Sequence, residues 1–289
     1  MKQIIVPLDL SDESINGLEL AIVISSKTKS DIQMVYVVKK SSDFPLISRE
    51  EEQQFARNRF QELMNNYEHK LAAGVKLSYI IKKGKIYDEI VEQAESFDDS
   101  AIVASTHGAS GFEEFFIGSN ALKIITACER PVFAIKYGIV PGNIRRILLP
   151  IDYTMDTRQK VPYTAKIAGY FGAQVHVMGV TTGNDQELVQ RIKTWTHQVS
   201  DHLKELGIET VTTMKRGESI SGMIVDYARE QKADLISIMT EQESAFRNFT
   251  IGSNAQQLIS KSPVPVLCIT SKDLQIRTGF KKYRGVPPA

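Results

Sequence analysis

Two tandem α/β units, each a five-stranded parallel sheet with helices on both faces, are what this 289-residue sequence predicts. Short apolar runs typical of buried strands alternate with segments of helical periodicity. The same order of elements occurs twice along the chain, which is the mark of an internal repeat. The motif Ile-Gly-Ser-Asn-Ala also occurs twice, at 117–121 and at 251–255.

In the first half, strands and helices follow one another in regular alternation. The first strand, Gln3 to Leu8, ends at Asp9, and Ser11 and Asp12 are residue types that cap helices. A long charged helix over 49–71 carries one apolar stripe, as a surface helix does. The other expected strands are 32–38, 75–81, 101–104 and 131–135, with further helices over 86–94 and 120–128.

The second half repeats this order with matching residues at matching places. Ile-Leu-Leu-Pro-Ile-Asp at 147–152 corresponds to Ile-Ile-Val-Pro-Leu-Asp at 4–9. A helix over 188–206 corresponds to the long helix of the first half but is expected to be shorter. The other expected strands are 175–180, 210–214, 234–238 and 265–269.

Residues 137–143 suit a short linker, since they include two glycines and a proline. We therefore expect a first domain over 1–138 and a second over 144–272. The remaining residues, 273–289, form a basic C-terminal tail, which is either solvated or packed on the other repeat.

The composition is that of an ordinary globular protein. Hydrophobic residues make up 42% and charged residues 24% of the chain, and the formal net charge of +1 gives no strong field for nucleic acid. No apolar run reaches the ~18 residues of a membrane helix, and the first residues do not resemble a signal peptide. With only two cysteines, Cys128 and Cys268, we expect no disulfide framework and a cytoplasmic location.

The segment from Ser105 to Asn120 has the parts of an anion-binding site. A turn containing Gly108 leaves the fourth strand, and Gly118 and Ser119 open the next helix. Glycine lets the backbone approach a phosphate, and the free N–H groups and positive dipole end of the helix attract its charge. Ser119 can donate its hydroxyl or cap the helix. The same pattern is compatible with a plain helix cap and no ligand.

The spacing resembles the nucleotide-binding signature of the universal stress protein family, which is Gly, two residues, Gly, nine residues, Gly, then Ser or Thr. Gly108, Gly118 and Ser119 match this signature, whereas Ser105 stands at the first glycine. With the order of elements and the duplication, the chain resembles a tandem member over nearly its whole length. The resemblance implies an adenine nucleotide alpha hydrolase-like, Rossmann-like fold with a nucleotide crevice at the carboxyl ends of the strands.

The resemblance also implies ATP or another adenine nucleotide, with or without Mg²⁺, as the ligand of the first half. Pro7-Leu8-Asp9 stands where the family's aspartate hydrogen-bonds adenine, although Asp9 is equally suited to cap the following helix. Val37 or Val38 would offer backbone groups to the base, Ser105 would lie near the ribose, and the glycine loop would hold phosphates. The expected site residues are Pro7, Asp9, Val38, Ser105, His107, Gly108, Gly118, Ser119 and Asn120.

In the second half the signature is degraded. Asp152 and Gly252 are retained, but Met239 and Gln242 stand at the positions of the first and second glycines. The loop that follows adds two carboxylates, which would repel a polyphosphate. We therefore expect one adenine-nucleotide site per chain, and a second crevice that rejects ATP or binds an uncharged ligand.

Three functions agree with these features. The leading one is a nucleotide-binding regulatory or stress-response protein rather than a turnover enzyme, because the cradle lacks a Walker lysine, a clear general base and an acidic pair for Mg²⁺. The alternatives are a weak ATPase, with His107 as a participant, and a protein interaction module that binds no nucleotide.

The two fifth strands, 131–135 and 265–269, are expected to join the halves. Both are mostly apolar, and an exposed apolar edge strand needs a cover. A short linker keeps the two copies close, which favours an internal pseudo-dimer. Whether two whole chains then pair is left open.

Other chemistry-bearing side chains are expected to be structural. His197 and His202 lie five residues apart on a helix and so on different faces, which argues against a metal pair. Trp195, Tyr227 and the two cysteines are expected to belong to the core.

Overall fold

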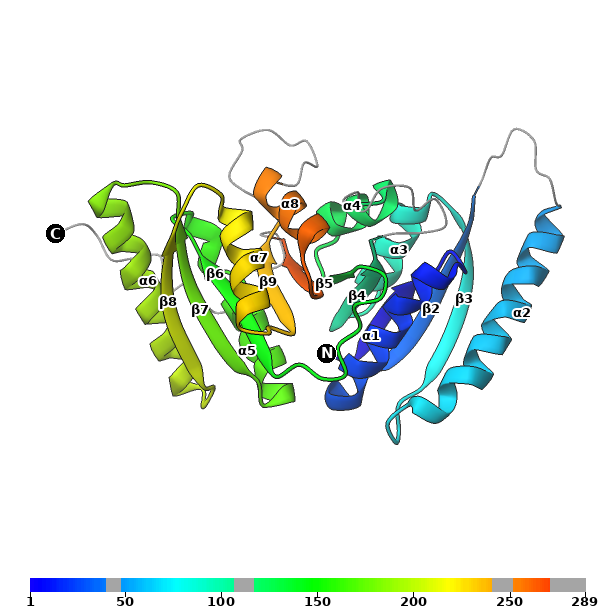
Figure 1. Cartoon of the computed structure of the whole chain (residues 1–289). Coiled ribbons are helices and arrows are strands. Elements are labelled where there is room, and N and C mark those ends of the chain that lie inside the picture. Colours follow the sequence, from blue (N-terminus) through cyan, green and yellow to red (C-terminus); the bar gives the residue numbers. More distant parts are fainter. Residues whose placement is uncertain (40–47, 107–116, 241–251, 271–289) are drawn as a thin grey trace.

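In the computed structural model, a single ten-stranded sheet runs through both halves of the chain (Figure 1). The structure describes residues 1–39, 48–106, 117–240 and 252–270. The strand order is β3-β2-β1-β4-β5-β10-β9-β6-β7-β8. Each half therefore contributes five strands, and both halves are arranged in the same order outward from the middle.

The elements of each half follow the alternation that the sequence predicts. The first half contains β1 (Gln3–Pro7), α1 (Asp12–Thr28), β2 (Asp31–Lys39), α2 (Arg49–Tyr67), the 3-10 helix η1 (Glu68–Lys70), β3 (Leu77–Gly84), α3 (Ile86–Glu95), β4 (Ser100–Ser105), α4 (Ser119–Ala127) and β5 (Val132–Ile135). The second half contains β6 (Arg146–Ile151), the 3-10 helix η2 (Met155–Arg158), α5 (Val161–Phe171), β7 (Gln174–Thr181), α6 (Gln186–Glu205), β8 (Thr210–Arg216), α7 (Ile220–Glu230), β9 (Leu235–Met239), α8 (Ser253–Lys261) and β10 (Val266–Ile269).

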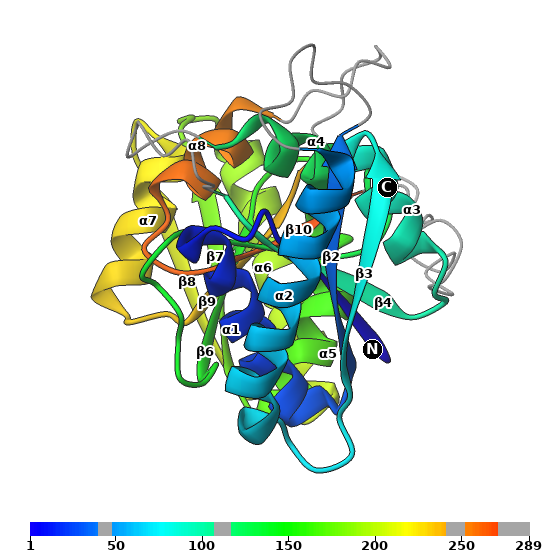
Figure 2. The ribbon, with the colours of Figure 1, turned by 90° about the vertical axis from the view of Figure 1, so that its right-hand side faces the viewer.

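Two apolar layers cover the two faces of the sheet. Successive residues of β1 alternate between them, with Ile4 and Val6 in one layer and Ile5 in the other, as the period of a strand requires. The first layer receives core side chains from α1, α2, α5 and α6, and the second from α3, α4, α7 and α8. Seen from the side of the first half, α2 lies across the outside of the molecule (Figure 2).

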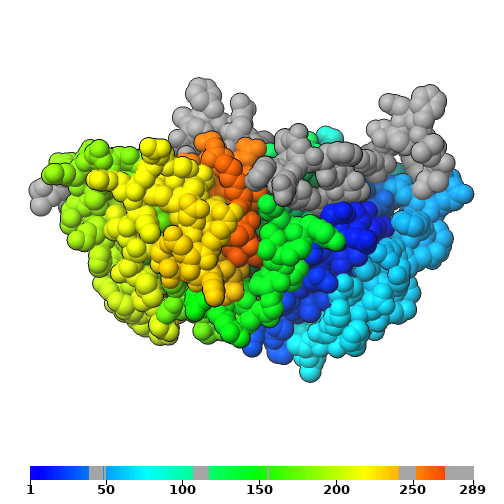
Figure 3. Space-filling model, viewed as in Figure 1, coloured from blue at the N-terminus to red at the C-terminus, as the bar shows by residue number. Residues whose placement is uncertain are grey.

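The halves are joined by β5 and β10, the only antiparallel neighbours among the described strands. Phe133 lies opposite Leu267 at the centre of the join, and both are 1% exposed. These two residues occupy equivalent places in the repeat, so a pseudo-two-fold axis passes between them. The two fifth strands are thus neighbours, as predicted, and the halves are in close contact in the space-filling view (Figure 3).

The sequence prediction was wrong about one helix. The helix predicted over 188–206 was expected to be shorter than its first-half counterpart, but α6 has 20 residues and α2 has 19. Two polar residues open α6 after the N-cap Asp185, whose carboxylate accepts from Glu187 N and Leu188 N at 2.9 and 3.3 Å. The larger part of the error lies in the first half, because α2 ends at Tyr67 and the chain tightens into η1 before the predicted end at residue 71.

Candidate functional site

The candidate site lies at the strand in the first half where the strand order changes direction. The chain adds β2 and β3 on one side of β1 and then returns to add β4 and β5 on the other. β1 pairs with β2 on one side and with β4 on the other, all in parallel. The carboxyl ends of these strands therefore meet at one edge of the sheet, at the topological switch point where ligands bind in such folds. Of the predicted site residues, this edge brings together Pro7, Asp9, Val38 and Ser105, at or just beyond the ends of the strands.

The second strand extends beyond its neighbour at this edge. Pro7, the last residue of β1, pairs with Val35, and β2 continues through residues 36–39. On its other side β2 stays paired with β3 as far as Gly84. The edge of residues 36–39 that faces β1 therefore has no partner strand in the described part of the chain. Main-chain groups on such an edge can hydrogen-bond a ligand.

Asp9 organises the turn that follows β1. Its Oδ1 accepts from Ser11 N at 3.1 Å and from Ser11 Oγ at 2.5 Å, and Asp9 is exposed. Ser11, not Asp9, is the N-cap of α1, since its Oγ accepts from Ser14 N at 3.3 Å. The capping alternative for Asp9 is therefore wrong. Between them, Leu10 has a φ of 66°, a left-handed conformation that costs energy and is frequent at functional sites.

Tyr36 forms a wall beside this turn that sequence reasoning missed. Its hydroxyl donates to Glu52 Oε1 of α2 at 2.7 Å. Burial, followed by the nearby charges of Glu52 and Asp9, raises the pKa of Tyr36 well above its usual range, so the phenol stays protonated. The sequence could have indicated Tyr36 as a site neighbour, because it lies two residues before Val38 on the same strand and so shares its face.

The glycine loop starts and ends at two points that are joined by a hydrogen bond. Gly118 N donates to Thr106 O at 2.8 Å, and Thr106 N donates to Ile135 O at 2.8 Å. Thr106 is 1% exposed. The loop between them, including His107 and Gly108, lies outside the described residues, so the roles expected of those two residues stay predictions.

The N-terminus of α4 faces the same edge. Gly118 is its N-cap, with no side-chain hydrogen bond to the first turn, so the prediction that Ser119 caps the helix is wrong. Ser119 and Asn120 are exposed in the first turn of the helix. Among the described residues, no side chain caps the first N–H groups of α4, as would be the case in an anion site.

The second half contains the same frame. Gly252 N donates to Thr240 O at 3.2 Å, and Thr240 N donates to Ile269 O at 3.0 Å. Asp152 Oδ1 accepts from Thr154 N and Thr154 Oγ1 at 2.9 and 2.6 Å, just as Asp9 accepts from Ser11. Met239 ends β9 in the place of Ser105. Gln242, at the second glycine position, lies outside the described residues.

The segment after Asp152 departs from this likeness. Where α1 already forms a regular helix, the second half forms η2 and begins α5 only at Val161. Lys160, immediately before α5, is 4% exposed. Burial lowers the pKa of its ammonium to about 8, and the charge of Asp152 opposes that shift.

Several other side chains have the structural roles expected of them. Cys128, Cys268 and Tyr227 are buried at 1%, 1% and 7% exposure. Trp195 packs against the core and lies 4.5 Å from the guanidinium carbon of Arg158. Across the part of the chain that the structure describes, no three His, Cys, Asp or Glu side chains form a group that could hold a metal ion.

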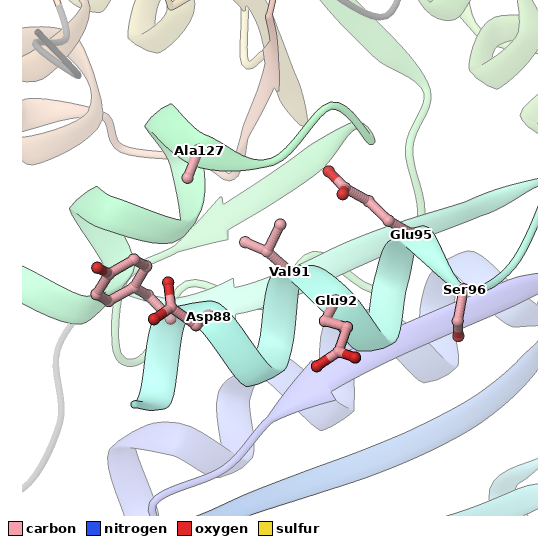
Figure 4. Close-up of a pocket in the computed structure, with 7 residues that line it drawn as sticks. Asp88, Val91, Glu92, Glu95, Ser96 and Ala127 are labelled. Carbon is pink, nitrogen blue, oxygen red and sulfur yellow. The ribbon is translucent and has the colours of Figure 1, made fainter. Parts of the chain in front are cut away.

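A separate groove of about 500 Å³ lies between α3 and the end of α4 (Figure 4). The labelled residues that line it are Asp88, Val91, Glu92, Glu95, Ser96 and Ala127. It runs along helices on one face of the sheet, and none of the described site residues lines it. Its carboxylates would repel a phosphate, so this groove is not the predicted nucleotide crevice.

The family is established by comparison with known sequences. The sequence model of the universal stress protein family matches twice, at residues 1–136 and 143–270. The chain therefore belongs to the universal stress protein family, as a member with two tandem domains. A universal stress protein of Methanocaldococcus jannaschii is 30% identical over 145 residues, which are 47% of this chain and 82% of that protein.

A solved structure that matches nearly the whole chain agrees with the fold. A universal stress protein from Archaeoglobus fulgidus DSM 4304 matches 93% of this chain and 98% of its own, with a TM-score of 0.75 and 21% identity. A shorter one from Archaeoglobus fulgidus, solved in complex with dAMP, matches 44% of this chain and 97% of its own, with a TM-score of 0.34 and 23% identity. The bound dAMP is a property of that protein. None of the helices in the described residues combines the length and apolar character needed to cross a membrane.

Proposed function

We propose that this protein binds one adenine nucleotide, ATP or a related one, in the crevice of the first half and acts as a regulatory or stress-response protein. The observation that carries the proposal is the unpaired edge of β2 beyond Pro7, because it presents main-chain groups beside Asp9 and Tyr36. A flat wall with main-chain donors and acceptors suits a purine.

The uncapped N-terminus of α4 supports the same proposal at the phosphate end. Gly118 brings the helix within one hydrogen bond of Thr106, next to Ser105 at the end of β4. Backbone N–H groups and the helix dipole would then hold phosphate oxygens, with Ser119 and Asn120 at the rim. Magnesium, if it accompanies the nucleotide, would be held by the phosphates. The two buried cysteines form no disulfide, which suits a reducing compartment, and we include a cytoplasmic location in the proposal.

Calorimetric titration with ATP, ADP and AMP tests the proposal, using two matched variants. Gly118→Asp and Gly252→Asp place the same carboxylate at equivalent helix N-caps. We expect one equivalent of nucleotide to bind the wild type, at least 100-fold weaker binding in Gly118→Asp through repulsion of the phosphates, and unchanged binding in Gly252→Asp.

Other outcomes would favour other functions. Two equal sites would contradict the asymmetry between the halves. No heat with any nucleotide would favour an interaction module. Steady phosphate release by the wild type, absent in Gly118→Asp, would favour a weak ATPase.

A further inference from the structure

Lys160 occupies a position that is glycine in the first half. Gly17 and Lys160 each lie eight residues after the strand-end aspartates Asp9 and Asp152. Each also lies twelve residues before a residue in the left-handed conformation, Lys29 or Gly172, that ends the helix. The chain has no insertion between these points, so the two positions are equivalent.

At Gly17 the helix lies close to the switch point of the first half. A Cβ placed there would be 3.3 Å from Val103 O and 3.5 Å from Ser105 N. Ser105 is the last residue of β4, next to the predicted ribose position. Gly17 therefore lets α1 pack closely against β4, and no side chain from this position enters the first crevice.

At the equivalent place the second half has a long side chain that turns back along its own segment. Lys160 Nζ donates to Thr157 O at 2.6 Å and to Thr157 Oγ1 at 3.2 Å. Thr157 Oγ1 also accepts from Asp152 N at 3.1 Å. Thr157 is 1% exposed, so both partners of this network are buried. Through Thr157, the network links Lys160 to Asp152, the residue that follows β6.

The network lies at the second switch point. β6 pairs with β7 on one side and β9 on the other, and η2, which contains Thr157, packs against both β6 and β9. The lysine donates hydrogen bonds to two oxygens of Thr157, and the charge of Asp152 favours its ammonium form without outweighing the effect of burial. A ligand would have to displace this buried network to reach the strand ends.

We propose that Lys160 is a specificity-determining residue, whose buried network closes the second crevice to nucleotides at a position where the first half has no side chain. The claim that the closed crevice excludes nucleotides rests on the proposed function. The burial of Lys160 in the crevice does not depend on that function. The second half then has a self-filled crevice, so that one chain offers one nucleotide site.

Transfer of the lysine to the first half tests the specificity. Gly17→Lys should weaken ATP binding at least 100-fold while the chain stays folded by near-ultraviolet circular dichroism. Gly17→Ala, which adds only a Cβ 3.3 Å from Val103 O and requires a shift of a few tenths of an ångström, is the packing control and should bind ATP within a few-fold of the wild type. Wild-type affinity in a folded Gly17→Lys variant would overturn the proposal.

The closure is tested without any nucleotide. Pulse acetylation of the native chain, followed by mass spectrometry, should modify Lys160 at least tenfold more slowly than Lys204, whose side chain is 58% exposed. Hydrogen exchange at Asp152 N should be at least tenfold faster in Lys160→Gly, because Thr157 Oγ1 loses the partner that holds it. Equal acetylation of the two lysines would overturn the closure even if Gly17→Lys failed to fold. If the wild type binds no nucleotide while Lys160 is protected, the proposed function fails and the closed crevice stands.

Discussion

The two crevices share a frame and differ in what fills it. Both have a strand-end aspartate that accepts two hydrogen bonds from the next Ser or Thr, and both have a helix N-cap glycine bonded to a threonine carbonyl. These features persist in a half whose signature is degraded, so they hold the fold together whether or not a ligand binds. What distinguishes a ligand site must lie in the residues that differ.

The two crevices also differ in the strands and side chains that form their walls. β2 extends four residues beyond its pairing with β1, at 36–39, whereas β7 extends only two beyond its pairing with β6, at 180–181. Tyr36 corresponds to Gly179, where an added Cβ would overlap Met214 Sδ and lie 2.8 Å from Thr196 Oγ1. In the second half a packed α6 therefore replaces the aromatic wall. A purine would find no aromatic wall and a shorter main-chain edge there.

The largest expected effect concerns the join between the halves. Phe133→Ala should lower the free energy of unfolding by about 3–5 kcal/mol and Leu267→Ala by about 2–5 kcal/mol, because each removes a buried side chain at the pseudo-two-fold axis. Since the two residues face each other, we expect both variants to lower one shared transition in urea. Separate transitions, with only one of them shifted by each variant, would show that the halves fold as independent units.

The next effect is the pH dependence that Lys160, in the second half, gives to the free energy of unfolding. The pKa of Lys160 is lowered by burial from 10.5 to about 8. Between these values the unfolded chain binds the proton more tightly than the folded chain, so this group's contribution to the free energy of unfolding rises as the pH increases from 8 to 10.5 and is lowest below 8. The full change is on the order of 3 kcal/mol.

Urea unfolding of the wild type and Lys160→Met at pH 7.5 and pH 10 measures this contribution. The advantage of Lys160→Met over the wild type should be greatest at the lower pH and should shrink at the higher one. Lys204→Met, at an exposed position, is the matched control and should show no such trend. A difference between the wild type and Lys160→Met that stays constant with pH would mean that the ammonium is solvated.

Much of this frame could be predicted from sequence. Apolar runs such as 101–104 fix buried strands, and the repeated Ile-Gly-Ser-Asn-Ala fixes the place of the helix after the loop. The switch-point residues follow, because parallel strands bring their carboxyl ends to one edge. The neighbouring fifth strands followed from the need to cover an apolar edge.

What could not be predicted is the environment of individual polar side chains. Lysine side chains are usually exposed, and the residues that flank Lys160 in the sequence give no sign that it is buried against Thr157. The Tyr36–Glu52 hydrogen bond joins a strand to a helix across a loop, so no local spacing reveals it. Ser119 resembled a helix cap, but Gly118 takes that position because the backbone bends one residue earlier.

The smallest expected effect compares two hydrogen bonds across the join whose donors occupy equivalent positions in the repeat. Lys136 and Thr270 follow β5 and β10, and each reaches a main-chain oxygen near the end of a helix in the other half. Lys136 Nζ donates to Ser260 O at 3.0 Å, and Thr270 Oγ1 donates to Cys128 O at 3.0 Å. The repeat thus uses a charged donor on one side of the axis and a neutral donor on the other.

Burial decides which of these bonds matters more. Thr270 is 4% exposed, so Thr270→Val, which keeps the shape, should cost about 1 kcal/mol because water cannot replace the lost donor. Lys136 is only half-buried, so Lys136→Met should cost less than about 1 kcal/mol, since water can solvate Ser260 O in its place. Urea unfolding of the two variants measures the order. A larger loss for Lys136→Met would mean that attraction between the ammonium and the end of α8, rather than burial, governs the contacts across the axis.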